Sequence, residues 1–200
     1  MSSRRSSLVN TTAFIEAGLS ESIETKTRVL KSLVPAIDRV AALWIRTLEG
    51  GRKILLFGNG GSASDSQHIA AELVGKLKVK RRALPALALT TDTSSLTAIA
   101  NDFSFEEVFE RQIEALGSPG DAAVGISTSG SSANVLAAIR KAQAIGLKTV
   151  AFTGRDGGPL AKLVDEAIVI PSDSTQRIQE AHITIAHILC ELVEARFAGS

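Results

Sequence analysis

The strongest structural signal in this sequence is the run Lys53-Ile54-Leu55-Leu56-Phe57-Gly58-Asn59-Gly60-Gly61-Ser62. Residues 54–57 are continuously apolar and end in a glycine-rich turn, a pattern typical of a buried strand that enters a tight loop. A helical pattern follows, and we expect Ser62 to cap its N-terminus, with Asp65 three residues later. The run therefore predicts one strand–loop–helix unit.

The same unit recurs along the rest of the chain. Four further apolar segments are predicted strands, at residues 85–89, 122–126, 149–152 and 167–170, and helical patterns separate them at residues 96–100, 108–116 and 135–145. Helical spacing also fills residues 11–50, where Pro35 marks a break or a first turn, and residues 175–197. Because parallel strands need crossover connections, this alternation predicts an α/β fold: a three-layer sandwich with a five-stranded parallel sheet flanked by helices and preceded by N-terminal helices.

Length and composition bound the domain organisation. The 200 residues are 44% hydrophobic and 22% charged, values that favour one soluble domain. We expect a flexible basic tail at residues 1–10 and a single domain at residues 11–200 that includes the N-terminal helical segment.

Charge and cysteine content exclude several classes of protein. The 22 Lys and Arg residues are balanced by 21 Asp and Glu residues, so the chain lacks the basic footprint of a nucleic-acid-binding protein. No apolar run approaches the ~20 residues of a membrane span, and polar residues interrupt the segment after Arg4-Arg5 that an export signal would keep apolar. Cys190, the one cysteine, rules out an internal disulfide and suits a reducing compartment. We therefore expect a cytoplasmic protein with neither a nucleic-acid nor a membrane partner.

Two predicted loops are suited to bind a phosphorylated ligand. In parallel sheets, ligands bind beyond the carboxyl ends of the strands, which here means residues 58–62 and 127–132. The first loop gives backbone N–H groups close access to a ligand, because glycine has no side chain. The second places five hydroxyl groups around Gly130, immediately before a helix. Hydroxyls, amides and a helix N-terminus form an uncharged phosphate cradle, although such loops also occur as ordinary strand-to-helix connections.

A dinucleotide site is an alternative interpretation of the first loop. Gly58, Gly60 and Ala63 match G-x-G-x-x-A between a strand and a helix, and Asp92 follows the second strand. However, Asp92 lies beyond the usual spacing of about twenty residues, and a dinucleotide site leaves the hydroxyl-rich loop unexplained. NAD binding is therefore the weaker alternative.

The three histidines, at positions 68, 182 and 187, carry the candidate chemistry. His68 and Glu72 are four residues apart and share a helix face, as metal ligands do and as ordinary ion pairs do. Gln179 and His187 are eight residues apart on the final helix, a rise of about 12 Å, so they meet at one ion only by reaching toward each other or by coming from two subunits. For His182 we expect an interface or solvent-exposed position.

Several motifs in one order resemble the phosphoheptose isomerase family. They are Gly58-Asn59-Gly60-Gly61-Ser62-Ala63, Gln67-His68-Ile69-Ala70-Ala71-Glu72-Leu73, Leu96-Thr97-Ala98-Ile99-Ala100-Asn101-Asp102, Gly125-Ile126-Ser127-Thr128-Ser129-Gly130 and Arg177-Ile178-Gln179-Glu180-Ala181-His182 through His187. The resemblance runs from about residue 11 to the end and implies a flavodoxin-like sugar isomerase (SIS) domain. Members of the family are cytoplasmic homotetramers. They convert sedoheptulose 7-phosphate to D-glycero-D-manno-heptose 7-phosphate, which feeds ADP- or GDP-activated heptose synthesis for bacterial surface polysaccharides such as lipopolysaccharide.

The resemblance also implies a site. It places one zinc ion per subunit on His68, Glu72, Gln179 and His187, and it makes Glu72 the base and His187 the acid of a proton transfer through an enediol or enediolate. It places the phosphorylated seven-carbon sugar on Asn59, Gly60, Gly61, Glu72, Asn101, Asp102, Ser127, Thr128, Ser129, Ser132 and Gln179. Lys76 and Gln176 depart from the family, because some members have Arg and Asp there. The roles of these two positions stay open.

Two other functions share parts of this pattern. Replication-initiator-associating proteins carry the glycine loop and the Arg-Ile-Gln-Glu segment but act by protein–protein contact, and they lack the Glu and His found here at 72 and 187. Phosphosugar-sensing SIS modules accompany a DNA-binding domain, for which we expect no room in this chain. The apolar excess of the N-terminal helices and of residues 183–193 favours an oligomer, which the resemblance makes a homotetramer with active sites near subunit interfaces.

Overall fold

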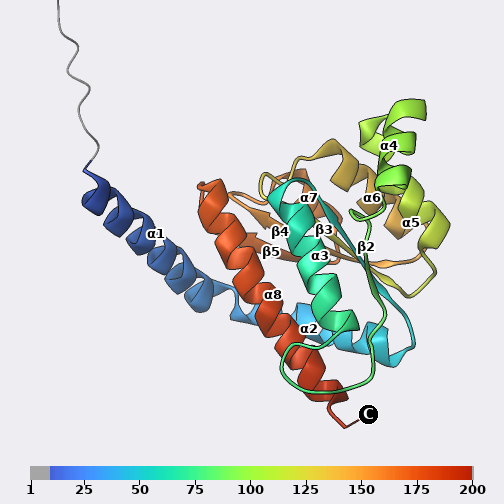
Figure 1. Ribbon diagram of the computed structural model, residues 1–200, viewed down its shortest axis with the longest axis horizontal. Helices are drawn as coiled ribbons and strands as arrows, with labels where there is room; N and C mark the ends of the chain where they lie inside the picture. The colour runs from blue at the N-terminus through green and yellow to red at the C-terminus, as the bar shows by residue number, and fades with distance from the viewer. Residues whose placement is uncertain (1–9, 200) are drawn as a thin grey trace, which may run out of the picture.

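Five strands form one parallel sheet in the computed structural model, which describes residues 10–199 (Figure 1). Their order across the sheet is β2-β1-β3-β4-β5, and every neighbouring pair is parallel. The strands are β1 (Ile54–Gly58), β2 (Ala86–Ala88), β3 (Ala122–Ser127), β4 (Lys148–Gly154) and β5 (Glu166–Ile170). The predicted five-stranded parallel sheet is thus confirmed, with strand ends that differ by one or two residues.

β2 is the shortest strand, and a proline directly precedes it. Pro85 has no N–H to add to the ladder, yet its carbonyl oxygen accepts a hydrogen bond from Ile54 N at 3.0 Å. Beyond the other end of β2, Leu89 N donates to Leu56 O at 2.8 Å. The whole predicted segment 85–89 therefore lies against β1, at the edge of the sheet.

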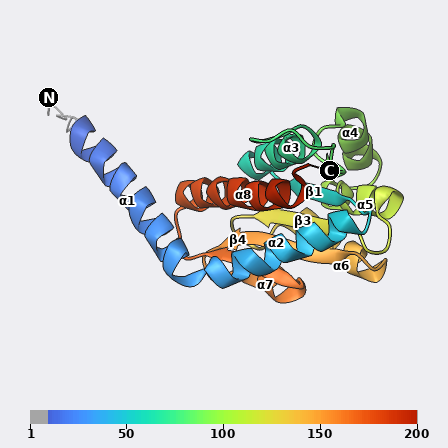
Figure 2. The same cartoon turned by 90° about the horizontal axis from the view of Figure 1, so that it is seen from below.

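Helices cover both faces of the sheet and give the predicted three layers (Figure 2). They are α1 (Thr11–Ser32), α2 (Val34–Glu49), α3 (Gly61–Val74), α4 (Thr93–Asp102), α5 (Glu110–Leu116), α6 (Ala133–Ala144), α7 (Gly158–Leu163), α8 (Thr175–Phe197) and the 3-10 helix η1 (Phe105–Glu107). One apolar cluster joins α2, α3 and α8 to the sheet, and a second joins α5, α6 and α7 to its other face. Successive side chains of β1 point to opposite faces of the sheet and so contribute to both clusters. Leu56 belongs to the first cluster, and Leu55 and Phe57 belong to the second.

The first helix projects from the body of the molecule (Figures 1 and 2). Within α1, which lies wholly among the described residues, Thr25 and Val29 are the buried positions. Pro35 lies in the first turn of α2, directly after the break at Leu33, as the sequence predicts. Large apolar side chains of α1 are exposed to solvent: Phe14, Ile15, Leu19, Ile23 and Leu30.

The start of α3 differs from the prediction. Gly60 occupies the cap position with a φ of 56°, no side chain caps the helix, and Ser62 lies buried inside it. The prediction of Ser62 as the N-cap was wrong because the positive φ of Gly60 turns the chain so that the helix starts two residues earlier. The predicted helix 108–116 also differs, because α5 begins at Glu110 and η1 precedes it.

The strand order reverses between β1 and β3. The chain leaves β1 toward β2 on one side and leaves β3 toward β4 on the other, while Gly58 pairs with Ile126 in the register of the two strands. The loops after β1 and β3 are therefore neighbours. Such a switch point is where parallel α/β sheets bind ligands.

Two further expectations concern the ends of the chain and membranes. Residues 1–9 of the predicted tail lie outside the described residues, whereas Asn10 caps α1 by accepting a hydrogen bond from Ala13 N at 3.2 Å. Within the described part of the chain, no helix combines the length and apolar character that a bilayer-spanning segment needs.

Candidate active site

An amide pair joins the two predicted ligand loops at the carboxyl end of the sheet. Asn59 Nδ2 donates to Asn134 Oδ1 at 2.9 Å, and Asn134 Nδ2 donates to Asn59 Oδ1 at 3.0 Å. Asn59 belongs to the glycine loop after β1, and Asn134 is buried in the first turn of α6. The pair therefore fixes the spacing between the two loops.

The loop after β3 presents its hydroxyl groups as a linked cluster. Ser127 Oγ lies 2.9 Å from Ser132 Oγ, and Ser131 Oγ donates to Ser129 Oγ at 2.9 Å. Thr128 is half-buried between them. Because the cluster directly precedes the N-terminus of α6, hydroxyl donors and helix amides face the same space, as an anion site requires.

The hydroxyl loop packs closely against the backbone at the start of α7. Leu160 N, in α7, donates to Gly130 O at 3.0 Å. Gly130 has a φ of 65° and lies so close to Gly157 that a side chain at position 130 would meet the carbonyl oxygen of Gly157. The glycine is therefore required at this position both by its conformation and by the space available.

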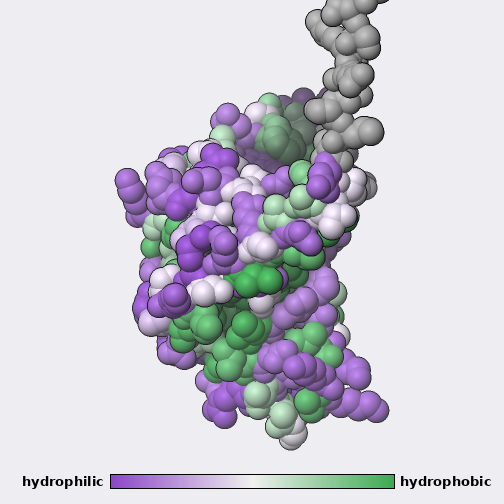
Figure 3. Space-filling view, turned by 90° about the vertical axis from the view of Figure 1, so that its left-hand side faces the viewer, coloured by the Kyte–Doolittle hydropathy of each residue, from purple (hydrophilic) through white to green (hydrophobic). Residues whose placement is uncertain are grey.

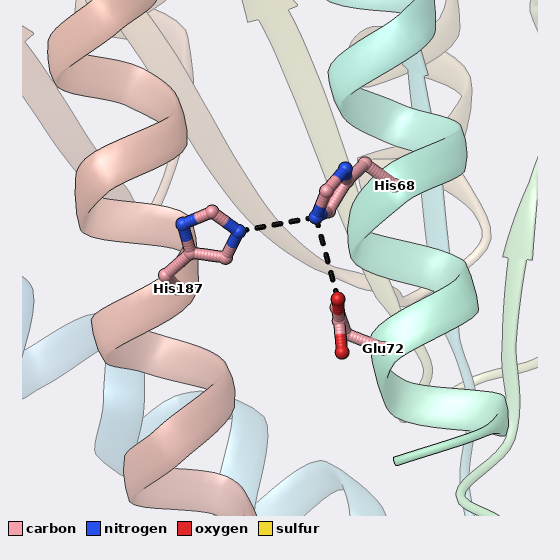
Figure 4. Close-up of side chains that lie close together, drawn as sticks. All are labelled: His68, Glu72 and His187. Carbon is pink, nitrogen blue, oxygen red and sulfur yellow. Dashed lines mark hydrogen bonds and ion pairs between the residues drawn. The ribbon is translucent and has the colours of Figure 1, made fainter. Parts of the chain in front are cut away.

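Two histidines and a glutamate meet between α3 and α8 (Figure 4). His68 Nε2 lies 3.0 Å from His187 Nε2 and 3.3 Å from Glu72 Oε1. The three ligand-type atoms all lie within 4.8 Å of one another. Tetrahedral zinc with N and O ligands at ~2.0–2.1 Å sets the ligand atoms about 3.3 Å apart. The donor types and their spacing therefore fit one zinc ion.

Parallel packing of α3 and α8 brings these side chains together. Gly61 lies beside Gln179 near the start of both helices, and His68 lies beside His187 further along both, so the two helices run in the same direction. His68 and Glu72 share a face of α3 through their four-residue spacing. His68 is exposed, and Glu72 and His187 are half-buried, so the centre is open to a ligand.

Asp65 is a fourth polar group near this centre. It lies one turn before His68 on α3, and its Oδ2 is buried with no hydrogen-bond partner among the described residues. Burial raises the pKa of Asp65, and the interaction with His68 only partly opposes that rise. Sequence reasoning used Asp65 only as a helix-start signal, although its three-residue spacing from His68 could have placed it at the site.

Gln179 lies at the other end of the α3–α8 contact from His187. A Cβ at Gly61 would lie 2.5 Å from Gln179 Nε2, so the half-buried amide packs directly on the glycine loop. Gly61 precedes His68 by seven residues, or about 10 Å of helix. Gln179 therefore adjoins the ligand loop within one chain, and its role as a fourth metal ligand stays a prediction.

The remaining predicted site residues lie at the surface. Asn101 and Asp102 end α4, where both are exposed and Asn101 Nδ2 donates to Asp102 Oδ1 at 2.8 Å. Lys76 and Gln176, the two departures from the family pattern, are exposed as well. The contacts of Asn101 and Asp102 with a sugar stay predictions.

His182 is buried, and the expectation of an interface or solvent-exposed position was wrong. Its side chain is 1% exposed, and its ring packs 5.7 Å from that of Phe152. Nε2 lies 3.0 Å from Thr153 O, and because a carbonyl oxygen can only accept, Nε2 is the donor. Burial lowers the pKa of His182 to about 4, so the ring is neutral. His182 therefore packs in the hydrophobic core and is not exposed at the site.

Comparison with known proteins finds relatives over most of the chain. The model of the SIS domain matches residues 19–154. A phosphoheptose isomerase from Aquifex aeolicus is 56% identical over 174 residues, which cover 87% of this chain and 91% of that protein. The structure of a phosphoheptose isomerase from Neisseria gonorrhoeae has a TM-score of 0.89 at 44% identity, covering 93% of this chain and 100% of that one. A phosphoheptose isomerase from Francisella tularensis has a TM-score of 0.91 at 35% identity, covering 94% and 100%. The predicted SIS fold is thus confirmed.

Proposed function

The chain belongs to the phosphoheptose isomerase family of SIS domain proteins, and on this premise we propose that it converts sedoheptulose 7-phosphate to D-glycero-D-manno-heptose 7-phosphate. This reaction would be the first step of ADP- or GDP-activated heptose synthesis. The observation that carries the proposal is the meeting of His68, Glu72 and His187 on the helix that starts at the glycine loop and on its neighbour. A non-catalytic SIS protein needs no such pair of carboxylate and imidazole.

Phosphate binding is assigned to the hydroxyl loop at residues 127–132. Its linked serines and the N-terminus of α6 supply donors without a cationic side chain. This agrees with a chain whose net charge is only +1. A phosphate held there would fix the position of the sugar and bring its reacting end to the carboxylate and imidazole groups.

The reaction itself is a proton relocation between two carbons and two oxygens. Glu72 would take a proton from C1 of the ketose and return it to C2, so that the double bond passes through an enediol. His187 would give a proton to O2 as that oxygen becomes a hydroxyl and accept the proton that leaves O1. Both side chains are half-buried and lie within reach of one substrate, as general acid–base catalysis requires.

Zinc, one ion per subunit, is the cofactor that we propose. His68, Glu72 and His187 would hold it, with Gln179 as the predicted fourth ligand. Zinc supplies a Lewis acid that polarises a carbonyl and stabilises negative charge developing on its oxygen.

The assembly that we propose is a homotetramer with active sites near subunit interfaces. Phe14, Leu19 and Ile23 of α1 are 72%, 62% and 66% exposed. An apolar groove continues between α1 and α8, and Figure 3 shows hydrophobic residues gathered on this side of the molecule. The groove includes Ile188, which directly follows His187, so a subunit packed there would border the site.

Turnover of sedoheptulose 7-phosphate, measured without additives, with chelator and then after addition of zinc, tests these proposals. We expect formation of the aldose phosphate, loss of activity on chelation and recovery with zinc. Absence of turnover under all three conditions would reject the proposed reaction. Turnover that is unchanged by chelator would reject only the proposed zinc cofactor. Thermal-shift titration with NAD is expected to show no binding.

A further inference from the structure

The segment that follows α3 is anchored by one buried carboxylate. Glu194, on α8, accepts hydrogen bonds from the backbone N–H groups of Leu77 at 3.0 Å, Lys78 at 2.7 Å and Val79 at 2.9 Å. Burial raises the pKa of Glu194, but these three bonds and the charge of Arg81 lower it by more, so the net shift is downward. The carboxylate is therefore ionised and holds the segment against α8.

Arg81 connects this carboxylate to the end of α3. Its Nε lies 3.8 Å from Glu194 Oε1, and the two side chains are 1% and 3% exposed. Its Nη2 donates to the carbonyl oxygen of Glu72 at 2.7 Å, and its Nη1 donates to that of Gly75 at 3.1 Å. One buried guanidinium therefore bonds the helix that carries Glu72 and pairs with the helix that carries His187.

Arg81 contacts α3 at its C-terminal end, where backbone carbonyl groups lack partners within the helix. Glu72 lies in the last turn of the helix, which ends at Val74. The last four carbonyl groups of a helix have no partner within it, and such turns fray unless another group bonds them. Arg81 bonds the Glu72 carbonyl, and a cation at a helix C-terminus is also favourable to the helix dipole. His68 lies a full turn earlier and does not depend on this support.

We propose that Arg81 and Glu194 are positioning residues that keep Glu72 aligned with His68 and His187. Glu194 follows His187 by seven residues, or two turns, so it lies on the same side of α8 as the centre. The pair thus sets the end of α3 against the helix face that presents His187. The catalytic consequence rests on the proposed function, whereas the dependence of the last turn of α3 on Arg81 does not.

The sharpest test is Arg81→Lys. Lysine keeps a buried positive charge for Glu194, but a single ammonium cannot replace the fork that bonds two carbonyl groups. In the zinc-free protein, we expect amide hydrogen exchange in residues 72–76 to accelerate, while exchange in the first two turns of α3 is unchanged. Zinc affinity, measured by chelator competition, is expected to fall about 10- to 100-fold. With zinc saturating, kcat is expected to fall and KM to change little.

Two controls separate positioning from general stability. Ile113→Ala, on α5, opens the second apolar cluster on the face of the sheet opposite α3 and α8, and it lowers the urea midpoint without touching the end of α3. Lys78→Ala removes an exposed ion pair with Glu191 from the same segment. We expect both controls to keep zinc affinity and the exchange pattern of α3.

Specific outcomes overturn the proposal. Unchanged exchange at residues 72–76 in Arg81→Lys, or an equal loss of zinc affinity in Ile113→Ala, would each reject it. Glu194→Gln provides the second arm, because it keeps an acceptor for the backbone amides and removes the charge that holds Arg81; unchanged exchange and zinc affinity there would reject the role of Glu194. If the wild-type enzyme does not turn over the sugar, the proposed function fails while the exchange result still decides the structural dependence.

Discussion

Asn59 and Asn134 exchange two hydrogen bonds, at 2.9 and 3.0 Å, that join the glycine loop to the first turn of α6. Each amide gives an N–H to the other's oxygen, so neither side chain can turn over without breaking both bonds. The pair lies where the strand order reverses between β1 and β3. The spacing of the two ligand loops is therefore fixed by side chains as well as by the sheet.

Replacing Asn134 tests whether that spacing serves the substrate. Asn134→Ala leaves the Asn59 amide without its partner, at a cost of about 1–3 kcal/mol in stability. We expect KM for the phosphorylated sugar to rise and kcat to change less, because Glu72 and His187 lie on other helices. Steady-state kinetics give both constants, and an unaltered KM would mean that the loops bind the sugar independently of each other.

Gly61 and Gln179 offer a second test. In Gly61→Ala, the new Cβ would come within 2.5 Å of Gln179 Nε2 at its present position, so the flexible glutamine side chain must move. We expect activity to fall while the urea midpoint changes little.

Gly60→Ala is the comparison for backbone strain in the same loop, and its readout is stability rather than activity, because Gly60 is itself a predicted sugar contact. Position 60 has a φ of 56° and open space around its missing side chain, so alanine there costs about 1–2 kcal/mol of backbone strain without meeting Gln179. Full activity in Gly61→Ala would exclude a role for the present position of Gln179.

Glu72→Gln removes the proposed base and keeps the size of the side chain. We expect turnover to be abolished while substrate binding stays measurable by calorimetry, because the hydroxyl loop at residues 127–132 is untouched. Near-normal turnover in this variant would show that another group moves the carbon-bound proton.

The sheet and its site were predictable from the sequence to different extents. Apolar runs such as 54–57 and the glycines after them predict strands and loops, because burial and backbone conformation are local properties. The burial of His182 could not be predicted, since the packing of α8 on the sheet decides which helix face is inside. Similarly, Arg81 belongs to a run of basic residues, a pattern that is typical of a solvent-exposed segment. Only tertiary packing brings its guanidinium to the carbonyl oxygen of Glu72.

The apolar surface of α1 predicts the behaviour of an assembly variant. Ile23 is 66% exposed, and Ile23→Glu would place a charge within the proposed interface, where burying it without a partner is unfavourable. We expect sedimentation to show dissociation to smaller species, with Ser20→Glu on the same helix as the control at a polar position. An unchanged molecular mass for Ile23→Glu would show that this face of α1 is not an interface.

His182 predicts a loss of stability in acid. Its pKa is about 4 in the folded protein, against 6.5 in the unfolded chain, so between these values the unfolded chain binds a proton that the folded protein excludes. Stability is therefore lost as pH falls from about 6.5 toward 4. The difference corresponds to about 3 kcal/mol when the transition is complete.

His182→Gln isolates this contribution, because glutamine can still donate an N–H to Thr153 O but does not titrate. Urea unfolding is measured between pH 7.5 and about 4.5, with chelator present and at one protein concentration. It gives, for the wild type and for the variant, the slope of the free energy of unfolding against pH. Other acid-sensitive groups such as Glu194 affect both proteins equally, so the difference between the slopes reports His182 alone. We expect the variant to lose less stability over this range, and parallel slopes would mean that the ring accepts a proton within the folded core.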